Sequence, residues 1–204
     1  MKTRILILMI AAIAVTLPVA AQAQQLFDFL GQANLPAGQG GTLSMYSIVS
    51  NPVPATPPLP LDFDSFQYTL VIVDLVLDVD GDPQEYSGGT ITIYEDAATA
   101  ADYAFPGTFV DGTAILIGTF DYLNRSMFTA TLGTASGQLD WTGGSMVDMI
   151  APDDRLDWLF FTGINALASQ VEPGYDEAWD GKVEPEHPIV PGEQMNWGEV
   201  KNAY

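Results

Sequence analysis

The chain has 204 residues, no cysteine, and 26 acidic against 6 basic residues, which gives a net charge of −20 at pH 7. Such a charge repels nucleic-acid phosphate and anionic lipid, so we expect neither as a partner. Charged residues make up 16% of the chain and hydrophobic residues 48%, which is the composition of a folded globular domain and excludes a disordered chain.

The first 23 residues have the features of a bacterial secretory signal peptide. Lys2 and Arg4 form a basic start, residues 5–17 an apolar core, and residues 21–23 an A-x-A cleavage site. Because the apolar core is too short to span a bilayer comfortably, we expect cleavage after Ala23 rather than a retained anchor. The mature chain then begins at Gln24, keeps 4 basic residues against 26 acidic ones, and is secreted or held at the cell surface without a membrane anchor of its own.

Strand patterns follow one another at short spacing through the mature chain. Residues 26–30 fit either a helical turn or a first edge strand, and residues 51–60 hold five prolines, which predicts a stiff loop outside any sheet. Strands are predicted at 42–49, 66–79, 90–94, 113–120, 126–132, 137–141, 156–167 and 178–183. No segment has the apolar face of a helix of ordinary length. We therefore expect one domain over 24–183, followed by an extended, proline-containing tail over 184–204.

The segment 66–79 decides between fold types. Its first half is apolar at odd and even positions alike, whereas Asp74 and Asp78 interrupt the second half. A strand that is apolar on both faces lies in the middle of a covered sheet. The pattern therefore favours an all-β antiparallel sandwich, jelly-roll-like and of about eight strands, over a small barrel. A sandwich has edge strands, through which copies of the chain could associate into oligomers or fibres.

An acidic loop follows this strand. Asp78, Asp80, Asp82 and Glu85 place four carboxylates around Gly81, and calcium prefers several oxygen ligands of this kind. The spacing departs from an EF-hand, since Gly89 stands where the bidentate Glu of that loop belongs. Calcium at this loop and a solvated turn are both open, and Asp153, Asp154 and Asp157 form a weaker second acidic cluster.

Catalytic chemistry has little support in the sequence. His187 is the one histidine and lies between prolines in the tail, so neither a Ser-His-Asp triad nor a zinc site of the usual His/Cys type is expected. A pair of carboxylates could hydrolyse a glycosidic bond, and Glu85 and Glu95 flank the strand at 90–94. With 26 acidic residues such pairs also arise by chance.

The tryptophans are the candidates for binding sugar rings. Trp141 and Trp158 lie within strand patterns, where core packing is expected. Trp179 and Trp197 lie in polar, glycine-containing surroundings and are the better candidates for the surface, where a platform for a glycan and simple packing or capping are both open.

Three stretches are familiar from other sequences. The segment GGTITIYED at 88–96 with ADY at 101–103, TFVDGTAILIG at 108–118, and GYDEAWDGK at 174–182 resemble uncharacterised exported bacterial proteins. The resemblance implies export and a β-rich fold, and it lends no activity or functional residue. Residues 184–188 echo a Pro-Glu-Pro sorting motif, but no apolar segment follows them.

Taken together, the sequence predicts an exported, acidic, non-catalytic β-domain that serves as a structural or binding module outside the cell and that calcium could stabilise. The alternative is a secreted glycan-binding module or a carboxylate-pair glycoside hydrolase.

Overall fold

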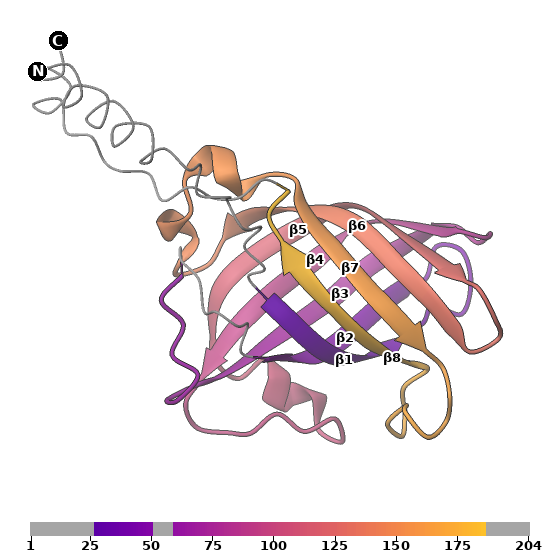
Figure 1. Cartoon of the computed structure of the whole chain (residues 1–204), viewed down its shortest axis with the longest axis horizontal. Coiled ribbons are helices and arrows are strands. Elements are labelled where there is room, and N and C mark those ends of the chain that lie inside the picture. The colour runs from indigo at the N-terminus through magenta and orange to yellow at the C-terminus, as the bar shows by residue number, and fades with distance from the viewer. Residues whose placement is uncertain (1–26, 51–58, 187–204) are drawn as a thin grey trace, which may run out of the picture.

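The computed structural model describes residues 27–50 and 59–186, whose eight strands form a closed barrel (Figure 1). The strands are β1 (Phe27–Asn34), β2 (Thr42–Ser50), β3 (Gln67–Val79), β4 (Gln84–Asp96), β5 (Thr113–Met127), β6 (Leu132–Gly143), β7 (Trp158–Asn165) and β8 (Glu177–Glu184). Three short 3-10 helices lie in the connections: η1 (Pro106–Phe109), η2 (Val147–Met149) and η3 (Pro152–Arg155). None of the helices in the described residues is long and apolar enough to cross a membrane.

The sheet closes because the last strand pairs with the first. Each strand is antiparallel to the next one in sequence, and Phe29 of β1 lies opposite both Val49 of β2 and Gly181 of β8. The predicted all-β fold of about eight antiparallel strands is confirmed, and the predicted sandwich is wrong. Closure pairs both sides of every strand, so these eight strands offer no free edge for association. The oligomeric state itself stays a prediction.

The sandwich was expected because β3 is apolar on both faces, and this burial is real. Tyr68, Leu70 and Ile72 point into the barrel and are fully buried, while Thr69 and Val71 on the outer face are only 2% and 3% exposed. The cover on Thr69 is the connection between β4 and β5, because the Thr69 Oγ1 donates a hydrogen bond to the Phe109 carbonyl of η1 at 2.7 Å. A loop therefore supplies the second layer that the sequence pattern attributed to another sheet.

Large aromatic side chains fill the interior. Phe160 of β7 contacts Phe29, Phe120 and Trp179 with ring centroids 5.3, 5.4 and 6.2 Å apart. Trp141 and Trp158 pack edge to face at 5.7 Å, which confirms that these two tryptophans belong to the core. An eight-stranded barrel is just wide enough for side chains to fill it, so rings of this size suit its interior.

Local breaks in the strands provide the curvature that closure needs. Asp74 on β3 has a φ of 58°, and Gly88 and Gly89 on β4 have φ values of 64° and 71°. A Cβ on Gly89 would lie 2.7 Å from the Leu75 Cα, so only glycine fits at this crossing of β3 and β4. Such irregular positions bend a strand and raise its twist. The carboxylate at position 74 that interrupts the apolar pattern therefore marks a bend.

Several strand boundaries differ from the predicted ones. The segment at 126–132 is not a strand of its own, since β5 runs on to Met127 and a tight turn follows. In that turn the Phe128 N–H donates to the Leu132 carbonyl at 2.8 Å. The register of β5 against β6 shifts between Phe120 and Tyr122. This shift interrupts the alternation of inward and outward side chains along β5, so the sequence pattern does not predict one long strand.

The ends of the chain lie largely outside the described residues. This applies to the predicted signal peptide at 1–23 and to His187 and Trp197 of the predicted tail. Strand β8 ends at Glu184, one residue beyond the predicted end of the domain at 183.

Candidate functional site

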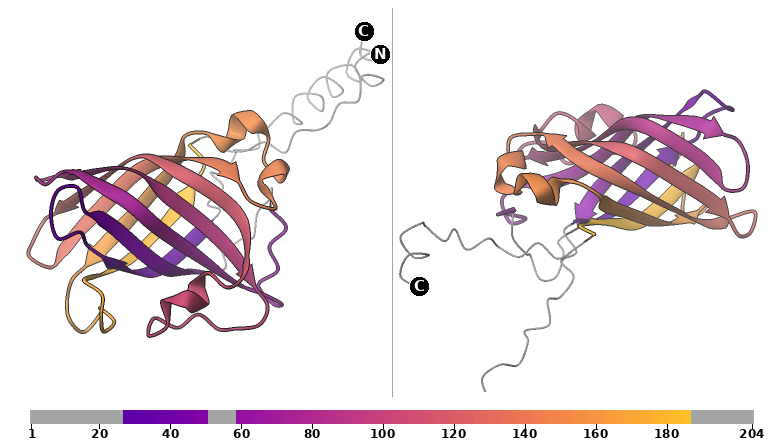
Figure 2. Two further views of the ribbon diagram at one scale, coloured as in Figure 1. Left: turned by 180° about the vertical axis from the view of Figure 1, so that it is seen from behind. Right: turned by 90° about the horizontal axis from the view of Figure 1, so that it is seen from above.

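A groove lies on the outer wall of the barrel, over β7, β8 and β1. Two connections extend over the groove: the β4–β5 connection contributes Tyr103, and the β7–β8 connection contributes Gln170. Both connections project below the barrel in Figure 1, and the left view of Figure 2 shows them from behind. The volume is about 570 Å³, and ligand sites commonly have about 300–1,000 Å³. The lining consists of Leu30, Gly31, Gln32, Tyr103, Leu132, Gly133, Gly163, Ile164, Asn165, Gln170, Ala178, Trp179 and Asp180.

Strand alternation places this groove outside the barrel. Phe29 and Ala33 of β1 point inward and are buried, whereas Leu30 between them is 56% exposed. Leu132 at the start of β6 is 47% exposed on the same outer wall. The groove therefore joins exposed apolar side chains to polar groups in a concave surface, as small-molecule sites do.

Four aromatic rings hold the two connections against the wall. Tyr103 lies 5.0 Å from Phe109 and 5.8 Å from Tyr175 between ring centroids. Tyr46 on the outer face of β2 contacts Phe109 at 5.7 Å and Tyr175 at 6.3 Å. We call Tyr46, Tyr103, Phe109 and Tyr175 the aromatic clamp. The clamp joins one strand to two loops that are far apart in sequence, so the groove is shaped before any ligand arrives.

Hydrogen bonds fix the position of Tyr103. Its phenol donates to the Leu30 carbonyl at 2.9 Å, and its own carbonyl accepts from the Tyr175 hydroxyl at 3.1 Å. Burial, with a smaller contribution from Tyr175 and the Glu172 carboxylate, raises the pKa of the Tyr103 phenol to about 12. The phenol therefore stays protonated, and a donor to Leu30, throughout the physiological pH range.

A buried glutamine anchors the β7–β8 connection. The Gln32 side chain is 8% exposed, donates to the Gln170 carbonyl at 3.3 Å and accepts from the Glu172 N–H at 3.0 Å. The carboxylate of Asp176 accepts from the Leu35 N–H at 2.7 Å. These contacts bind the loop to β1 and to the residue that follows it, and they position the polar rim of the groove.

The floor of the groove is made of small residues. Gly163 of β7 lies opposite Asp180 of β8, and Asn165 lies opposite Ala178 two positions further along the strand pair. A Cβ on Gly163 would meet only the Asp180 carbonyl, at 3.7 Å, so the space above this glycine is open. The missing side chain deepens the groove at its centre, and it also makes Gly163 a position where the groove can be filled by mutation.

One charged side chain lines the groove. Asp180 is exposed, and it has no hydrogen-bond or salt-bridge partner in the part of the chain that the structure describes. The three basic side chains of that part, Arg125, Arg155 and Lys182, pair with other carboxylates. The groove is thus apolar and amide-lined, with a single negative charge.

A second polar cluster lies inside the barrel, near the β3–β4 and β5–β6 turns. The Arg125 guanidinium donates to both carboxylate oxygens of Glu177, with Nε to Oε2 at 3.1 Å. Its Nη1 donates to the Gln84 Oε1 at 2.9 Å, and the Trp179 Nε1 donates to the Glu177 Oε2 at 3.0 Å. Each of these groups is satisfied by another, so the cluster is a structural ion pair. The sequence offered no sign of it, since Arg125 and Glu177 are 52 positions apart.

The carboxylates predicted to bind calcium lie in the β3–β4 hairpin. Asp78, Asp80, Asp82 and Glu85 are all exposed, and the Asp80 Oδ1 accepts from the Gln84 side chain at 2.9 Å. They are not among the carboxylates that the structure brings within 4.8 Å of one another, which in the described residues form a different group. Calcium at this hairpin stays a prediction.

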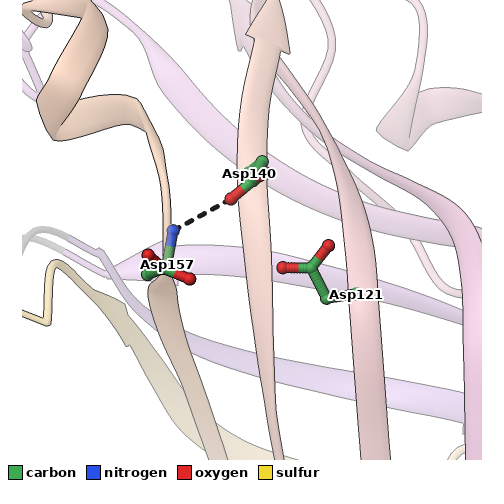
Figure 3. A group of neighbouring side chains, drawn as sticks. All are labelled: Asp121, Asp140 and Asp157. Carbon is green, nitrogen blue, oxygen red and sulfur yellow. Dashed lines mark hydrogen bonds between the residues drawn. The ribbon is translucent and has the colours of Figure 1, made fainter.

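That other group consists of Asp121 on β5, Asp140 on β6 and Asp157 just before β7 (Figure 3). The Asp157 N–H donates to the Asp140 Oδ1 at 2.9 Å. Partial burial and then the charges of Asp140 and Asp157 raise the pKa of the Asp121 carboxyl. Three converging carboxylates can hold a hard cation such as calcium or magnesium. The sequence flagged Asp157 alone of the three, because only strand pairing brings the other two beside it.

Two of the predicted binding residues have different outcomes. Trp179 does not lie at the surface as predicted, because its ring packs in the barrel core and is 1% exposed. Two polar neighbours suggested a surface position for Trp179. Asp180 does point outward, but Glu177 points into the barrel and takes part in the ion pair with Arg125. Trp197 lies outside the described residues.

The carboxylate pair considered for glycoside hydrolysis is too widely spaced. Glu85 and Glu95 stand ten positions apart on the single strand β4, which corresponds to about 30 Å at about 3.3 Å per residue. Carboxylates that cleave glycosides lie about 5–10 Å apart. Glu95 instead accepts a hydrogen bond from the Tyr68 hydroxyl at 2.7 Å.

No protein-family model, curated protein or solved structure matches this chain.

Proposed function

We propose that this chain is an exported, non-catalytic binding module and that the groove on its outer wall is the ligand site. The observation that carries the proposal is the groove itself, about 570 Å³ in volume, with its walls fixed by the aromatic clamp and by Gln32. A cavity of this size with apolar walls and a few placed polar groups is the usual form of a small-molecule site.

Export is proposed from the sequence, where residues 1–23 have the three parts of a signal peptide. The acidity of the chain is consistent with a soluble protein outside the cell, since a net charge far from zero keeps proteins from associating. The measurement is the N-terminal residue of the protein recovered from outside the cell. Gln24 supports the proposal, and an intact Met1 contradicts it.

The groove is tested by filling it. Valine at position 163 suits a strand and places its methyl groups in the open space above β7. We expect Gly163→Val to weaken binding of any ligand found in a fragment and glycan screen at least tenfold, with little change in melting temperature.

The matched control is Gly143→Val on β6. A Cβ at Gly143 would meet its nearest neighbour, Ile117, at 3.8 Å, so the two glycines have similar clearance, but Gly143 does not line the groove. We expect this variant to bind like the wild type. If every ligand found has the same affinity for the wild type and for Gly163→Val, the ligand site lies elsewhere and the proposal is wrong.

Glycan binding remains the second candidate. The observation in its favour is a tyrosine beside the more exposed side-chain amides of Asn165 and Gln170, since amides can bond sugar hydroxyls and rings can stack on aromatic faces. Trp179 no longer contributes to this argument because it is buried. A glycan-array signal that Gly163→Val abolishes would favour this candidate, and a blank array would remove it.

Stabilisation by calcium is also proposed, at the hairpin of Asp78, Asp80, Asp82 and Glu85 or at the group of Asp121, Asp140 and Asp157. The supporting observation is that each set supplies at least three exposed or half-buried carboxylates, which in the second set converge within 4.8 Å of one another.

A further inference from the structure

We infer that the groove selects an amphipathic organic cation, whose charged end pairs with Asp180 and whose apolar body lies along Leu30, Tyr103 and Leu132. The inference rests on the proposed function, and it names the class of ligand that the same groove would take.

The charge of the groove is the first argument. Asp180 is its one charged lining residue, and the side chain has no hydrogen-bond or salt-bridge partner within residues 27–50 and 59–186. The nearest cation on the strand, Lys182, pairs with Glu184 at 2.7 Å. An anionic ligand would meet this carboxylate on a chain whose net charge is −20.

The two residues that face Asp180 across the sheet carry no charge of their own. On one side it faces Gly163, which has no side chain, and on the other it faces Leu30 of β1. Asp28, two residues before Leu30, has a raised pKa: partial burial is the main cause, the opposing Lys182 ammonium lowers the pKa, and the charges of Asp180 and Glu184 raise it. A cation bound at Asp180 would remove the part of this repulsion that Asp180 contributes.

The apolar walls are the second argument. Leu30 and Leu132 are 56% and 47% exposed beside the ring of Tyr103. A sugar lying here would press hydroxyl groups against leucine side chains and lose their hydrogen bonds to water. An aromatic or aliphatic body loses nothing on these walls, and a positive end bonded to Asp180 fixes its orientation in the groove.

The experiment uses two probes that share an indole ring and a two-carbon linker and differ in the terminal group. Tryptamine carries an ammonium group, and tryptophol carries a hydroxyl in its place. Their affinities for the chain Gln24–Tyr204 are measured by calorimetry at constant ionic strength, for the wild type and for Asp180→Asn. We expect tryptamine to bind about fivefold more tightly than tryptophol in the wild type, which is near the upper range for an ion pair at an exposed carboxylate.

The variants separate this ion pair from general attraction to an acidic protein. Asp180→Asn should weaken tryptamine about fivefold and leave tryptophol unchanged. The control is Asp153→Asn in η3, an equal change of charge at an exposed site outside the groove, and it should change neither affinity appreciably. Gly163→Val should weaken both probes, because it fills the space that both indole rings need.

Each result leads to one conclusion. Equal affinities for the two probes, both lost in Gly163→Val, would overturn the cation inference and leave the groove as a site for neutral ligands. An equal loss of tryptamine in Asp180→Asn and Asp153→Asn would also overturn it, since the attraction would then come from the whole surface. Failure of tryptamine to bind the wild type would overturn it as well, and the proposed function would then be decided separately by the wider screen with Gly163→Val.

Discussion

At the scale of single residues, the ion pair inside the barrel is the feature whose loss should cost the most stability. Arg125 and Glu177 are 9% and 2% exposed, and the guanidinium makes a bidentate contact with the carboxylate. Removing one partner of such a pair leaves a buried charge without compensation. We expect Arg125→Met to lower the free energy of unfolding by about 3–5 kcal/mol, measured by urea denaturation.

Two further variants show whether the cost lies in the orphaned charge. The double variant Arg125→Met with Glu177→Gln removes that charge, and it should recover part of the loss. Lys182→Met breaks the partly exposed contact with Glu184 and should cost about 1 kcal/mol or less. If Arg125→Met were no worse than Lys182→Met, the ion pair would contribute little to the stability of the barrel.

At the scale of elements, the carboxylates of neighbouring strands supply a test for calcium. Asp121, Asp140 and Asp157 meet on the outer wall, and the hairpin with Asp80 and Asp82 projects from the barrel elsewhere. A cation that binds only the folded chain raises stability by about 2.7 kcal/mol at a hundredfold excess over its dissociation constant. We expect calcium to raise the melting temperature by several degrees and a chelator to reverse the rise.

Variants at the two places identify the site. Asp140→Asn should abolish the rise if the converging group binds the ion, whereas Asp80→Asn with Asp82→Asn should abolish it if the hairpin does. Sodium chloride at equal ionic strength is the control for screening of the acidic surface. A rise that sodium chloride reproduces in full would mean that neither group is a specific site.

The same scale shows how much of the molecule the sequence could predict. Alternation of side chains located most strands, because one face of each lies in the core. Alternation could not distinguish a sandwich from a barrel. The layer that covers Thr69 of β3 on its outer face comes from η1, which is distant from β3 in the sequence. The groove was out of reach for a related reason, because Leu30, Tyr103 and Asp180 converge only after the first and last strands pair.

Tryptophan positions illustrate the limit at its sharpest. Polar neighbours in sequence suggested a surface position for Trp179, yet strand alternation turns the ring inward while Asp180 points to solvent. The Arg125–Glu177 pair then satisfies the indole nitrogen from within. Composition around a residue is therefore a weaker guide than its parity along a strand, and parity is known only once the strand boundaries are known.

At the scale of the whole molecule, buried tyrosines make the barrel sensitive to alkali. Burial raises the pKa values of Tyr68, Tyr86 and Tyr103 to about 12, against 10.0 for an ordinary phenol. A hydrogen bond to Glu95 raises that of Tyr68 further, and the charge of Arg125 partly offsets the rise at Tyr86. Between these two pH values the unfolded chain releases phenolic protons that the folded chain keeps.

The sign of the effect follows from proton linkage. Where the unfolded state binds fewer protons than the folded state, the free energy of unfolding falls as pH rises. These three phenols should therefore leave stability unchanged well below pH 10 and lower it progressively between pH 10 and about 12. For Tyr86, which is 1% exposed, the loss should approach about 3 kcal/mol once the pH passes about 12, since the pKa rises by about two units and each unit corresponds to about 1.4 kcal/mol.

Urea denaturation at a series of pH values, with phenolate absorbance recorded in parallel, measures this loss. Tyr86→Phe removes one of the three phenols and should flatten the fall between pH 10 and 12 by about a third. Tyr122→Phe, at a ring that is 41% exposed, serves as the matched control. An identical slope in the wild type and in Tyr86→Phe would mean that other groups cause the alkaline unfolding, and it would remove the buried phenols as the reason that the barrel opens.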